Sequence, residues 1–412
     1  MKKMLILGIG CVSLKYLAQA LQPYGYRPVV LARLAQFSEQ IQSHFEDLEV
    51  HDVDIGSSAA VLAYLHDHRV AFSDVVAITS LFDEQFPLVE TLAAEFDWAS
   101  PGHVVARLSQ KNSVLSLIPE YSPPSVCFTS ENLHCLDLSP LEAWGEKLVI
   151  KPALSSGGLG LGHLTGREQL HQHLTEHLAQ SGLGAETEWI LQQEVSGRLL
   201  SYEGYVDAGW VRRLGISSRS RIGFTEVASR YPADDSLSQA IIARGWDCIE
   251  SLIRRGDYQY GYFHCEFIQT DTSVYLVDAN IGRIGGATVL EQVALAHHIC
   301  PHQLLAHVLL LPLLRSRCPL SPCANARLEP LKTLGIWYGL PVAGNLEQLR
   351  LAPVRGQHTQ FAAEGSQVPG VGESDYAWVG MLSGLEEEVL LDIHGITLQT
   401  DKGVFQPAFS VD

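Results

Sequence analysis

Two apolar stretches, GYFHCEFI (261–268) and VYLVDANIGRIGG (274–286), decide the fold of this chain, and both carry acidic side chains. Side chains of a β-strand point alternately to the two faces of a sheet. Glu266 therefore lies on the face away from the neighbouring phenylalanines, and Asp278 and Asn280 share one face. Pairing of the strands around a short polar turn places Glu266 opposite or diagonal to Asp278. The two stretches predict an antiparallel hairpin with an oxygen-rich face.

That face admits two interpretations. Carboxylates on strands this apolar are costly unless they are paired or bind a cation, and oxygen ligands suit Mg²⁺, with Mn²⁺ as an alternative. The plainer interpretation is the exposed face of an ordinary hairpin that ends in a glycine-rich turn. The segment 281–286 favours the ligand site, because its glycines let the backbone approach a ligand closely. Within it, Arg283 supplies a planar cation for a carboxylate or a phosphoryl group.

A second element with chemical potential lies upstream, in LVIKPALSSGGLG (148–160). Lys151 ends a predicted strand, 147–151, so its amino group projects from a fixed point. A glycine-rich loop, 155–160, and a further strand, 161–164, follow. A P-loop would need G-x-x-x-x-G-K-[ST] before a helix, which is not found here. The pattern is typical of a flap whose backbone N–H groups face phosphates, and a simple hairpin tip fits it as well.

The first hundred residues alternate short apolar strands with helical patterns, which is typical of a parallel sheet built from β-α-β units. The turn after the first strand contains Gly8 and Gly10 but has Ser13 where a dinucleotide-binding fingerprint needs a third glycine. A tight turn is therefore favoured over a dinucleotide site. The predicted strands are 4–7, 28–31 and 74–78, and the predicted helices are 13–21, 57–66 and 85–96.

The fold class is α/β, with four predicted domains. They are an N-terminal parallel α/β domain (1–108), a small domain with the flap (109–187), a large antiparallel domain with the acidic hairpin (188–330) and a small β-rich C-terminal domain (331–412). Beyond the elements named above, the pattern predicts antiparallel hairpin strands at 189–194, 201–206 and 210–216, and helices at 111–118, 167–180, 237–254 and about 288–306.

Composition and charge exclude several classes of protein. The 412 residues are 46% apolar, which suffices for a sizeable core, and the net charge of −18 opposes general binding of nucleic acid or anionic membranes. Eight irregularly spaced cysteines are not typical of a disulfide framework. The start, MKKMLILGIGC (1–11), imitates a signal peptide, but a buried strand with a glycine turn fits it better. We therefore expect a cytoplasmic protein without nucleic-acid or membrane partners.

The order of these motifs resembles the ATP-grasp superfamily, especially its carboxylate–amine ligases, such as the amino-acid ligases that form dipeptides. The resemblance spans roughly residues 1–310 and rests on a combination of motifs. Lys111 precedes a proline turn, Lys151 precedes the flap, a QQEV hinge occupies 192–195, and the acidic hairpin leads to Arg283. The resemblance implies an ATP-grasp architecture, in which two antiparallel sheets clamp ATP. Residues 109–187 would then be the lid domain and 188–330 the nucleotide and metal domain.

The resemblance also implies a role for each motif residue. Arg283 would be catalytic and would steady an acyl phosphate, while Glu266, Asp278 and Asn280 would hold Mg²⁺. The residues implied to bind ATP are Lys111, Lys151, the flap residues Ser155, Ser156, Gly157 and Gly158, the hinge residues Gln192, Gln193, Glu194 and Val195, and Glu203.

Three features depart from the family pattern. Asp278 stands where the family usually has Glu, and Arg283 follows Asn280 by three residues instead of the commoner two. Leu199 occupies the usual place of a ribose-binding Glu, so Glu203 is expected to take that role. A basic cluster is expected to lie mostly on the surface, with one or two members, Arg230 first, available to a substrate anion; the cluster consists of Arg212, Arg213, Arg219, Arg221 and Arg230.

The function that the resemblance implies is an ATP-dependent carboxylate–amine ligase. Such an enzyme forms an amide or peptide bond through an acyl phosphate and releases ADP and Pi. Its cofactors would be ATP and Mg²⁺, its substrates small carboxylates and amines such as amino acids, and a homodimer is left open. Two alternatives are a bicarbonate-using carboxylase of the purine or biotin type, which would share the nucleotide residues, and a nucleotide-binding protein without catalysis.

Overall fold

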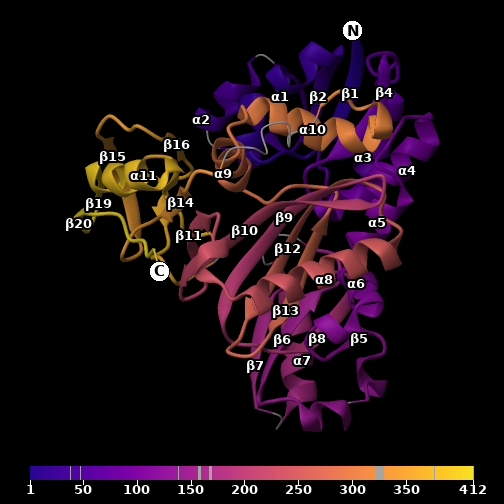
Figure 1. Cartoon of the computed structure of the whole chain (residues 1–412), viewed down its shortest axis with the longest axis vertical. Coiled ribbons are helices and arrows are strands. Elements are labelled where there is room, and N and C mark those ends of the chain that lie inside the picture. The colour runs from indigo at the N-terminus through magenta and orange to yellow at the C-terminus, as the bar shows by residue number, and fades with distance from the viewer. Residues whose placement is uncertain are drawn as a thin grey trace.

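The computed structural model describes residues 1–37, 39–46, 48–137, 139–155, 159–166, 169–320, 329–374 and 376–411. It contains one parallel sheet and three largely antiparallel sheets, with helices on their faces. In Figure 1 the N-terminal part lies at the top, the large sheet in the middle, a smaller sheet at the bottom and the C-terminal part at the left. The α/β fold class predicted from the sequence, with its four-part architecture, is confirmed.

The N-terminal part is a four-stranded parallel sheet in the order β3-β2-β1-β4. The three predicted strands are confirmed, and the structure adds β3, whose sequence EVHD is too polar and too short to stand out as a strand. The elements here are β1 (Lys2–Leu7), α1 (Cys11–Leu21), β2 (Tyr26–Ala32), α2 (Glu39–Gln42), β3 (Glu49–Asp52), α3 (Ser58–Asp67), β4 (Val75–Ser80) and α4 (Phe86–Phe96).

A second four-stranded sheet, which we call the lid sheet, has the order β5-β8-β6-β7 and carries α7 on one face. The strand predicted at 189–194 exists, but it pairs with β5 and β6 and not with the strand that follows it. Its elements, with the two helices that lead to it, are α5 (His103–Leu108), α6 (Lys111–Leu117), β5 (Ser125–Thr129), β6 (Lys147–Pro152), β7 (Gly162–Thr165), α7 (Leu170–Ser181) and β8 (Glu188–Gln193).

The large sheet has eight strands, in the order β13-β12-β9-β10-β11-β14-β18-β16. The helix α8 covers one face, and its buried side chains join the apolar residues of β9, β12 and β13. These strands are β9 (Arg198–Asp207), β10 (Trp210–Ile222), β11 (Thr225–Tyr231), β12 (Tyr260–Gln269), β13 (Val274–Ile281), β14 (Thr333–Tyr338), β16 (Gln357–Gln360) and β18 (Gly380–Leu385), and the helix is α8 (Gln239–Gly256).

The single helix predicted at about 288–306 is wrong, because the chain forms two helices there, α9 (Val289–Ala296) and α10 (Pro301–Leu314), at 110° to each other. His298 has a positive φ of 57°, and Pro301 is the first residue of α10, so the chain turns between them. Within the described part of the chain, no single helix is long and apolar enough to cross a membrane.

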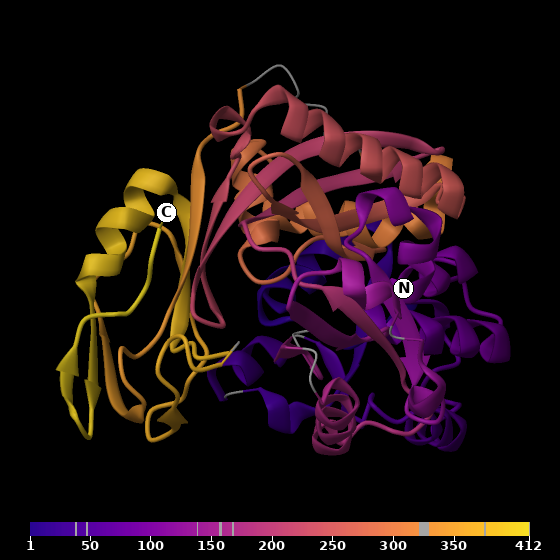
Figure 2. The same cartoon turned by 90° about the horizontal axis from the view of Figure 1, so that it is seen from below.

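The C-terminal part extends the large sheet and adds a small sheet of its own. Strand β14 pairs with β11, which joins this part to the large sheet, and a second sheet has the order β17-β15-β19-β20. Seen from below, the C-terminal part stands on one side of the molecule and the N-terminal part on the other (Figure 2). The added elements are β15 (Gly344–Leu351), β17 (Gln367–Val368), α11 (Glu386–Asp392), β19 (Ile396–Thr400) and β20 (Gly403–Phe405).

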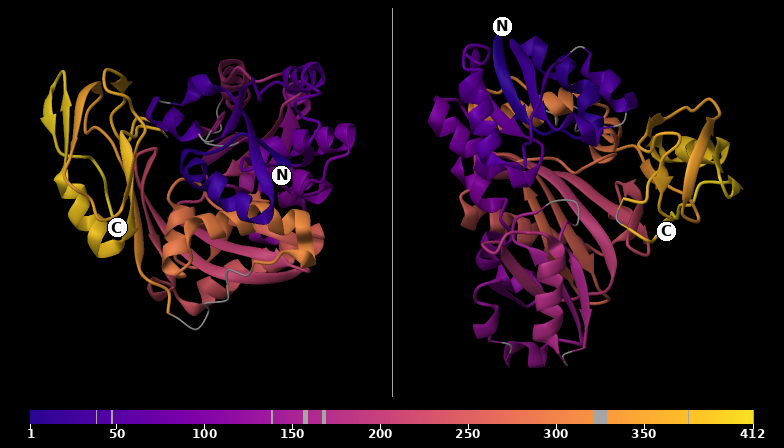
Figure 3. Two further views of the ribbon diagram at one scale, coloured as in Figure 1. Left: turned by 90° about the horizontal axis from the view of Figure 1, so that it is seen from above. Right: turned by 180° about the vertical axis from the view of Figure 1, so that it is seen from behind.

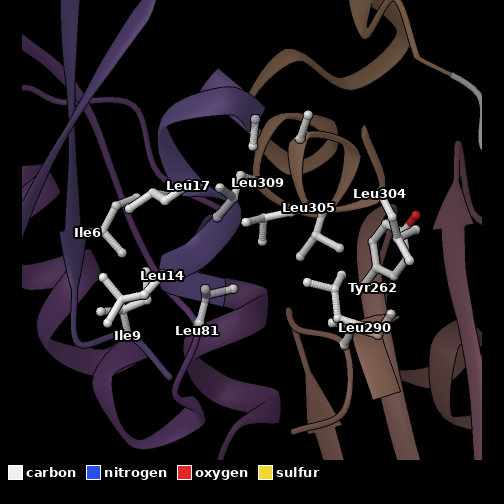
Figure 4. Close-up of a cluster of buried hydrophobic side chains, with 14 of the residues drawn as sticks. Ile6, Ile9, Leu14, Leu17, Leu81, Tyr262, Leu290, Leu304, Leu305 and Leu309 are labelled. Atoms are coloured by element: carbon white, nitrogen blue, oxygen red, sulfur yellow. The ribbon is translucent and has the colours of Figure 1, made fainter. Parts of the chain in front are cut away.

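An apolar core fixes the N-terminal part against the large sheet. The helix α10 packs on α1 and on β12, so it lies between the two parts, as Figure 3 shows from above and from behind. Side chains from both parts meet there, including Leu14 and Leu17 from α1 and Leu305 and Leu309 from α10 (Figure 4). Each fully buried side chain of this size contributes about 1.5–3 kcal/mol. The carboxyl edge of the parallel sheet is thereby held near the end of β13.

One glycine brings the end of β13 into contact with the N-terminal part. Gly282 has a φ of +98°, which favours glycine. A Cβ at this position would lie 2.5 Å from Cγ1 of Val105 in α5 and 2.8 Å from Cζ of Phe86 in α4. The backbone after β13 therefore lies directly against these two helices, and Arg283 follows at once.

Candidate active site

The hairpin of β12 and β13 has the predicted register. Glu266 pairs with Asp278 and His264 pairs with Asn280, so the three residues assigned to the metal share one face. An irregularity follows Glu266, because Phe267 pairs with Leu276. The expected juxtaposition of the two acidic side chains is confirmed.

Glu266 is held by two cationic groups that the sequence did not single out. A guanidinium nitrogen of Arg219 donates to Oε1 of Glu266, and Nε2 of His264 lies 3.1 Å from the same oxygen. Burial alone would raise the pKa of Glu266, but Arg219 and His264 outweigh it and hold that pKa well below its usual value. Glu266 is therefore an ionised carboxylate, as a metal ligand needs to be.

Arg219 and His264 are each held by a second carboxylate. Nε of Arg219 donates to Oε1 of Glu226 at 2.6 Å, and Nδ1 of His264 lies 2.5 Å from Oε1 of Glu203. Burial alone would lower the pKa of His264, but the carboxylates of Glu203 and Glu266 raise it to about 9. The imidazole is therefore protonated at neutral pH, and it bridges Glu203 and Glu266.

Two lysines join the lid side of the site to this hairpin. Nζ of Lys111 donates to the carbonyl oxygen of Ser155 at 2.7 Å and lies 3.4 Å from Oδ1 of Asp278. Nζ of Lys151, on β6, donates to the carbonyl oxygen of Val277 on β13 at 2.7 Å. The lid sheet and the large sheet therefore face each other across the predicted nucleotide site, with both cations between them.

Lys151 is almost wholly buried, with 8% of its surface exposed. Burial is the main reason why its pKa is lowered to about 8, and nearby Lys111 adds to the effect. Asp278 and Glu266 oppose it. A phosphate group placed beside Nζ would stabilise the charged form of this lysine and raise its pKa again, so the site is suited to an anion.

Arg283 links the hairpin to the N-terminal part. Its Nε donates to Oδ1 of Asp83, a buried carboxylate that follows β4, while Nη2 donates to Oδ1 of Asn280 at 2.6 Å and Nη1 to the carbonyl oxygen of Ile284 at 3.3 Å. Burial alone would lower the pKa of Arg283, but Asp83 outweighs it and raises that pKa. Its N–H groups that lack a partner among the described residues remain available to an anion.

The predicted hinge runs from the end of β8 toward β9. Gln192 is buried, and its amide donates to the carbonyl oxygen of Pro123 at 3.3 Å. The backbone N–H of Gln193 donates to the carbonyl oxygen of Pro124 at 2.9 Å, and Oε2 of Glu194 lies 3.1 Å from Nδ1 of His163. Val195 is half-buried. The hinge thus joins the two sheets, with its first residues fixed by the lid.

Glu203, the residue expected to bind the ribose, does not have the position that this role needs. Glu203 is fully buried in the large sheet, where it contacts His264, and its Oε2 has no hydrogen-bond partner among the described residues. In this position Glu203 orients His264 and is poorly placed to contact a ribose. Of the predicted flap, Ser155 receives the hydrogen bond of Lys111; Ser156, Gly157 and Gly158 lie outside the described residues.

Comparison with solved structures identifies the architecture. No protein-family model and no curated protein sequence matches the chain. The structure of an L-amino acid ligase from Bacillus licheniformis is similar, with a TM-score of 0.71 and 15% identity over 100% of this chain and 99% of that one. The structure of the biotin carboxylase domain of a 2-oxoglutarate carboxylase from Hydrogenobacter thermophilus, with MgADP, ADP and bicarbonate, is also similar. Its TM-score is 0.71 at 13% identity, over 98% of this chain and 91% of that one.

A phosphoribosylglycinamide synthetase from Anaerococcus prevotii gives a TM-score of 0.65 at 15% identity, over 96% of this chain and 99% of that one. These matches extend over almost the whole of each chain. The chain has the ATP-grasp fold. The resemblance inferred from the motif order is thus confirmed at the level of the fold, and it extends past residue 310 to the C-terminal part.

The donor set of this ATP-grasp fold fits a magnesium ion that also binds phosphates. Two carboxylates, of Glu266 and Asp278, and the amide oxygen of Asn280 are hard oxygen ligands on neighbouring positions of one hairpin. Among the described residues, no three His, Cys, Asp or Glu side chains lie close enough to hold a metal by themselves. These three residues would supply only part of a coordination shell, which nucleotide oxygens would have to complete.

Sequence reasoning missed the cations and the carboxylate that come from distant segments. The sequence places Arg219 in a basic cluster that is expected to lie mostly on the surface. Its partner Glu266 is 47 residues away, so no local pattern links the two. Asp83 lies 200 residues from Arg283 and had no motif around it. In the structure Arg219 pairs with Leu199 across β9 and β10 and so faces the same side as Ser201 and Glu266, a register that the sequence alone does not give. Arg230, favoured for a substrate anion, instead donates to Glu386 at 2.8 Å.

Proposed function

We propose that this chain is an ATP-dependent ligase that joins a small carboxylate to an amine through an acyl phosphate and releases ADP and Pi. One observation carries the proposal. The two sheets of the ATP-grasp fold face each other across Lys111, Lys151 and the acidic hairpin, and Arg283 lies just beyond the hairpin. Cations suited to phosphates, oxygen ligands suited to Mg²⁺ and the remaining N–H groups of Arg283, which are suited to an anion, would thus follow one another along the site.

ATP would lie between the lid sheet and the large sheet. Lys111 and Lys151 would contact its phosphates, and the hinge 192–195 would offer backbone groups to the adenine. Glu266, Asp278 and Asn280 would hold Mg²⁺, which neutralises phosphate charge when bound. His264 and Arg219 keep Glu266 ionised and fixed until the metal binds. The predicted domain limits, 1–108, 109–187, 188–330 and 331–412, stay a proposal, and two strands cross them: β8 begins the third segment but pairs in the lid sheet, and β14 begins the fourth but extends the large sheet.

The chemistry would proceed in two transfers. A carboxylate oxygen of the substrate attacks the terminal phosphorus of ATP, and ADP leaves. The amine, once it has lost a proton to solvent, attacks the acyl carbon with its nitrogen, and the bond from that carbon to the phosphate oxygen breaks. Pi leaves and takes the second proton of the nitrogen. Arg283, whose remaining N–H groups can bind an anion, would stabilise the charge that develops on the acyl group. A single well-placed donor of this kind contributes on the order of 10²–10³ in kcat.

The substrates would be amino acids or similar small molecules. The similar structure from Bacillus licheniformis is that of an L-amino acid ligase, which supports this substrate class. A second candidate is a bicarbonate-using carboxylase. The Hydrogenobacter thermophilus carboxylase structure, which contains bicarbonate, reaches the same TM-score of 0.71.

A phosphate-release screen separates these candidates. The purified chain is supplied with MgATP and with pairs of carboxylates and amines, chiefly amino acids, and in parallel with bicarbonate alone. The proposal predicts ADP and Pi only when both a carboxylate and an amine are present, with the amide detected by mass spectrometry. Turnover stimulated by bicarbonate without an amino acid would favour the carboxylase, and MgATP binding with no turnover would favour a non-catalytic nucleotide-binding protein.

A further inference from the structure

Asp83 is a buried carboxylate at the reacting end that the proposed chemistry has so far left without a role. It follows β4 at the carboxyl edge of the parallel sheet, and only 2% of its surface is exposed. The segment before it is fixed, because Oγ of Ser80 donates to the carbonyl oxygen of Leu7 at 2.6 Å and accepts the N–H of Phe82 at 2.9 Å. Asp83 therefore occupies one defined position beside Arg283.

Only one oxygen of this carboxylate is in use. Oδ1 accepts the hydrogen bond of Nε of Arg283, and Oδ2 has no hydrogen-bond partner among the described residues. Because Asp83 as a whole is only 2% exposed, an oxygen of it without a protein partner has lost most of its hydration, which is costly. In proteins such groups usually have a partner, so the open position on Oδ2 points to a ligand that is not part of the chain.

The other carboxylates of the site are already engaged. Glu266 contacts Arg219 and His264, Asp278 contacts Lys111, and both are assigned to the metal. Glu203 also has an open oxygen, but it is fully buried inside the sheet behind His264. Among the described residues of the site, Asp83 is thus the carboxylate that combines an open oxygen with a place beside the proposed anion site.

The proposed reaction brings a cation to this place. Most amines, including those of amino acids, are ammonium ions at neutral pH, and a carboxylate is the protein group that binds an ammonium ion most strongly. Arg283 alone would repel the incoming cation. Asp83 offsets that charge, and only the guanidinium group of Arg283 separates it from the proposed position of the acyl phosphate.

We propose that Oδ2 of Asp83 binds the ammonium group of the amine substrate. This inference rests on the proposed ligase function and assigns the acceptor side of its site. Arg283 then lies between the two substrates, with the acyl phosphate on its free N–H groups and the amine on the carboxylate that holds its Nε. The parallel sheet of the N-terminal part supplies the amine site, and the acidic hairpin supplies the phosphate side.

The test compares a charged acceptor with an uncharged one. Hydroxylamine is mostly uncharged at mildly alkaline pH and captures acyl phosphates as hydroxamates, so it does not need an ammonium site. In Asp83→Asn the amide oxygen can still accept the hydrogen bond of Arg283, but the negative charge is gone. We expect the KM for the amine to rise by about 10- to 100-fold, as for a lost hydrogen bond to a charged group. Hydroxamate formation, which does not use the ammonium site, should fall by a much smaller factor than amide formation at low amine concentration.

A matched control is Asp67→Asn, which removes an exposed carboxylate from α3 in the same part of the chain. It should change neither activity. An unchanged KM for the amine in Asp83→Asn would overturn the inference. Equal loss of amide and hydroxamate formation would overturn it as well, because Asp83 would then act only by positioning Arg283.

A folding defect in Asp83→Asn would show in its melting curve. In that case Asp83→Glu, which keeps the negative charge, becomes the variant that tests the inference. That variant should retain hydroxamate formation and show an altered KM for the amine; loss of both activities, or an unaltered KM, would contradict the inference. Failure of the function itself looks different. A wild-type chain that forms neither hydroxamate nor amide with any carboxylate would overturn the proposed ligase, and the inference with it.

Discussion

The burial of Lys151 lowers the stability of the folded chain, and its charge is proposed to serve nucleotide binding. Burial lowers its pKa from 10.5 to about 8. Between about pH 8 and 10.5 the unfolded chain therefore binds more protons than the folded chain, so this residue's contribution to stability becomes more favourable as pH rises through that window. Below about pH 8 the cost of the buried charge is fully present. A bound triphosphate would remove it by pairing with the ammonium group.

Lys151→Met should therefore stabilise the nucleotide-free chain at pH 7, by on the order of 2 kcal/mol once the lost hydrogen bond to Val277 is allowed for. The same variant should lose the stabilisation that ATP confers. Denaturant unfolding with and without MgATP measures both effects. Lys147→Met, at the exposed start of β6, is the matched control and should change neither. A lower unfolding midpoint for Lys151→Met without nucleotide would contradict the cost assigned to burial.

The residues proposed to hold the metal and to bind an anion should be needed for the chemistry. Asp278→Asn and Arg283→Met should each lower kcat by about 10²–10³, since each removes a contact to the charge that moves in the reaction. Steady-state kinetics at saturating Mg²⁺ measures this. Asp271→Asn, in the exposed turn of the same hairpin, is the control. Near-normal kcat in either variant would show that its role has been wrongly assigned.

The residues of the site could be predicted from the sequence only where local geometry decides their position. Glu266 and Asp278 share a hairpin, so strand alternation and a short turn place them together. The partners Arg219 and Asp83 reach the site through the order of strands and the packing of whole parts of the chain. No pattern within a strand or helix contains that information.

Gly282 decides whether the end of β13 can lie against α4 and α5. Gly282→Ala should be destabilising by more than about 1 kcal/mol, because its φ of +98° disfavours a side chain and the new Cβ would overlap Val105 and Phe86. Gly286→Ala is the control four residues later, since a Cβ there meets nothing within 4 Å. Chemical denaturation compares the two. Equal stability of both variants would contradict the close approach that places Arg283 beside Asp83.

At the scale of elements, apolar periodicity located most strands and helices but not their partners. The strand near residue 190 was expected to form a hairpin with the next strand, yet β8 joins the lid sheet, because β5, which no sequence pattern had singled out, pairs along its other edge. The long apolar run after residue 288 predicted one helix. The fold needs two, since their buried faces pack against different strands.

At the scale of the whole molecule, the proposed nucleotide site depends on two sheets from different parts of the chain that face each other. A ligand that bridges them should stabilise both. At about 100 times its Kd, MgATP should add about 2.7 kcal/mol, or roughly 5–10 °C in melting temperature. ATP with EDTA should stabilise much less, because the acidic hairpin repels phosphates unless a metal lies between them. Melting scans test this; equal melting temperatures in all conditions would leave the nucleotide site without support.

The most direct test of the account follows one oxygen atom. The chain is incubated with MgATP, an amine and a carboxylate substrate labelled with ¹⁸O, and the products are separated and weighed by mass spectrometry. If the carboxylate attacks the terminal phosphorus, one labelled oxygen passes into inorganic phosphate, the nucleotide product is ADP, and the amide keeps the other labelled oxygen. Label recovered in AMP, or inorganic phosphate free of label, would contradict an acyl phosphate and with it the ligase proposed here.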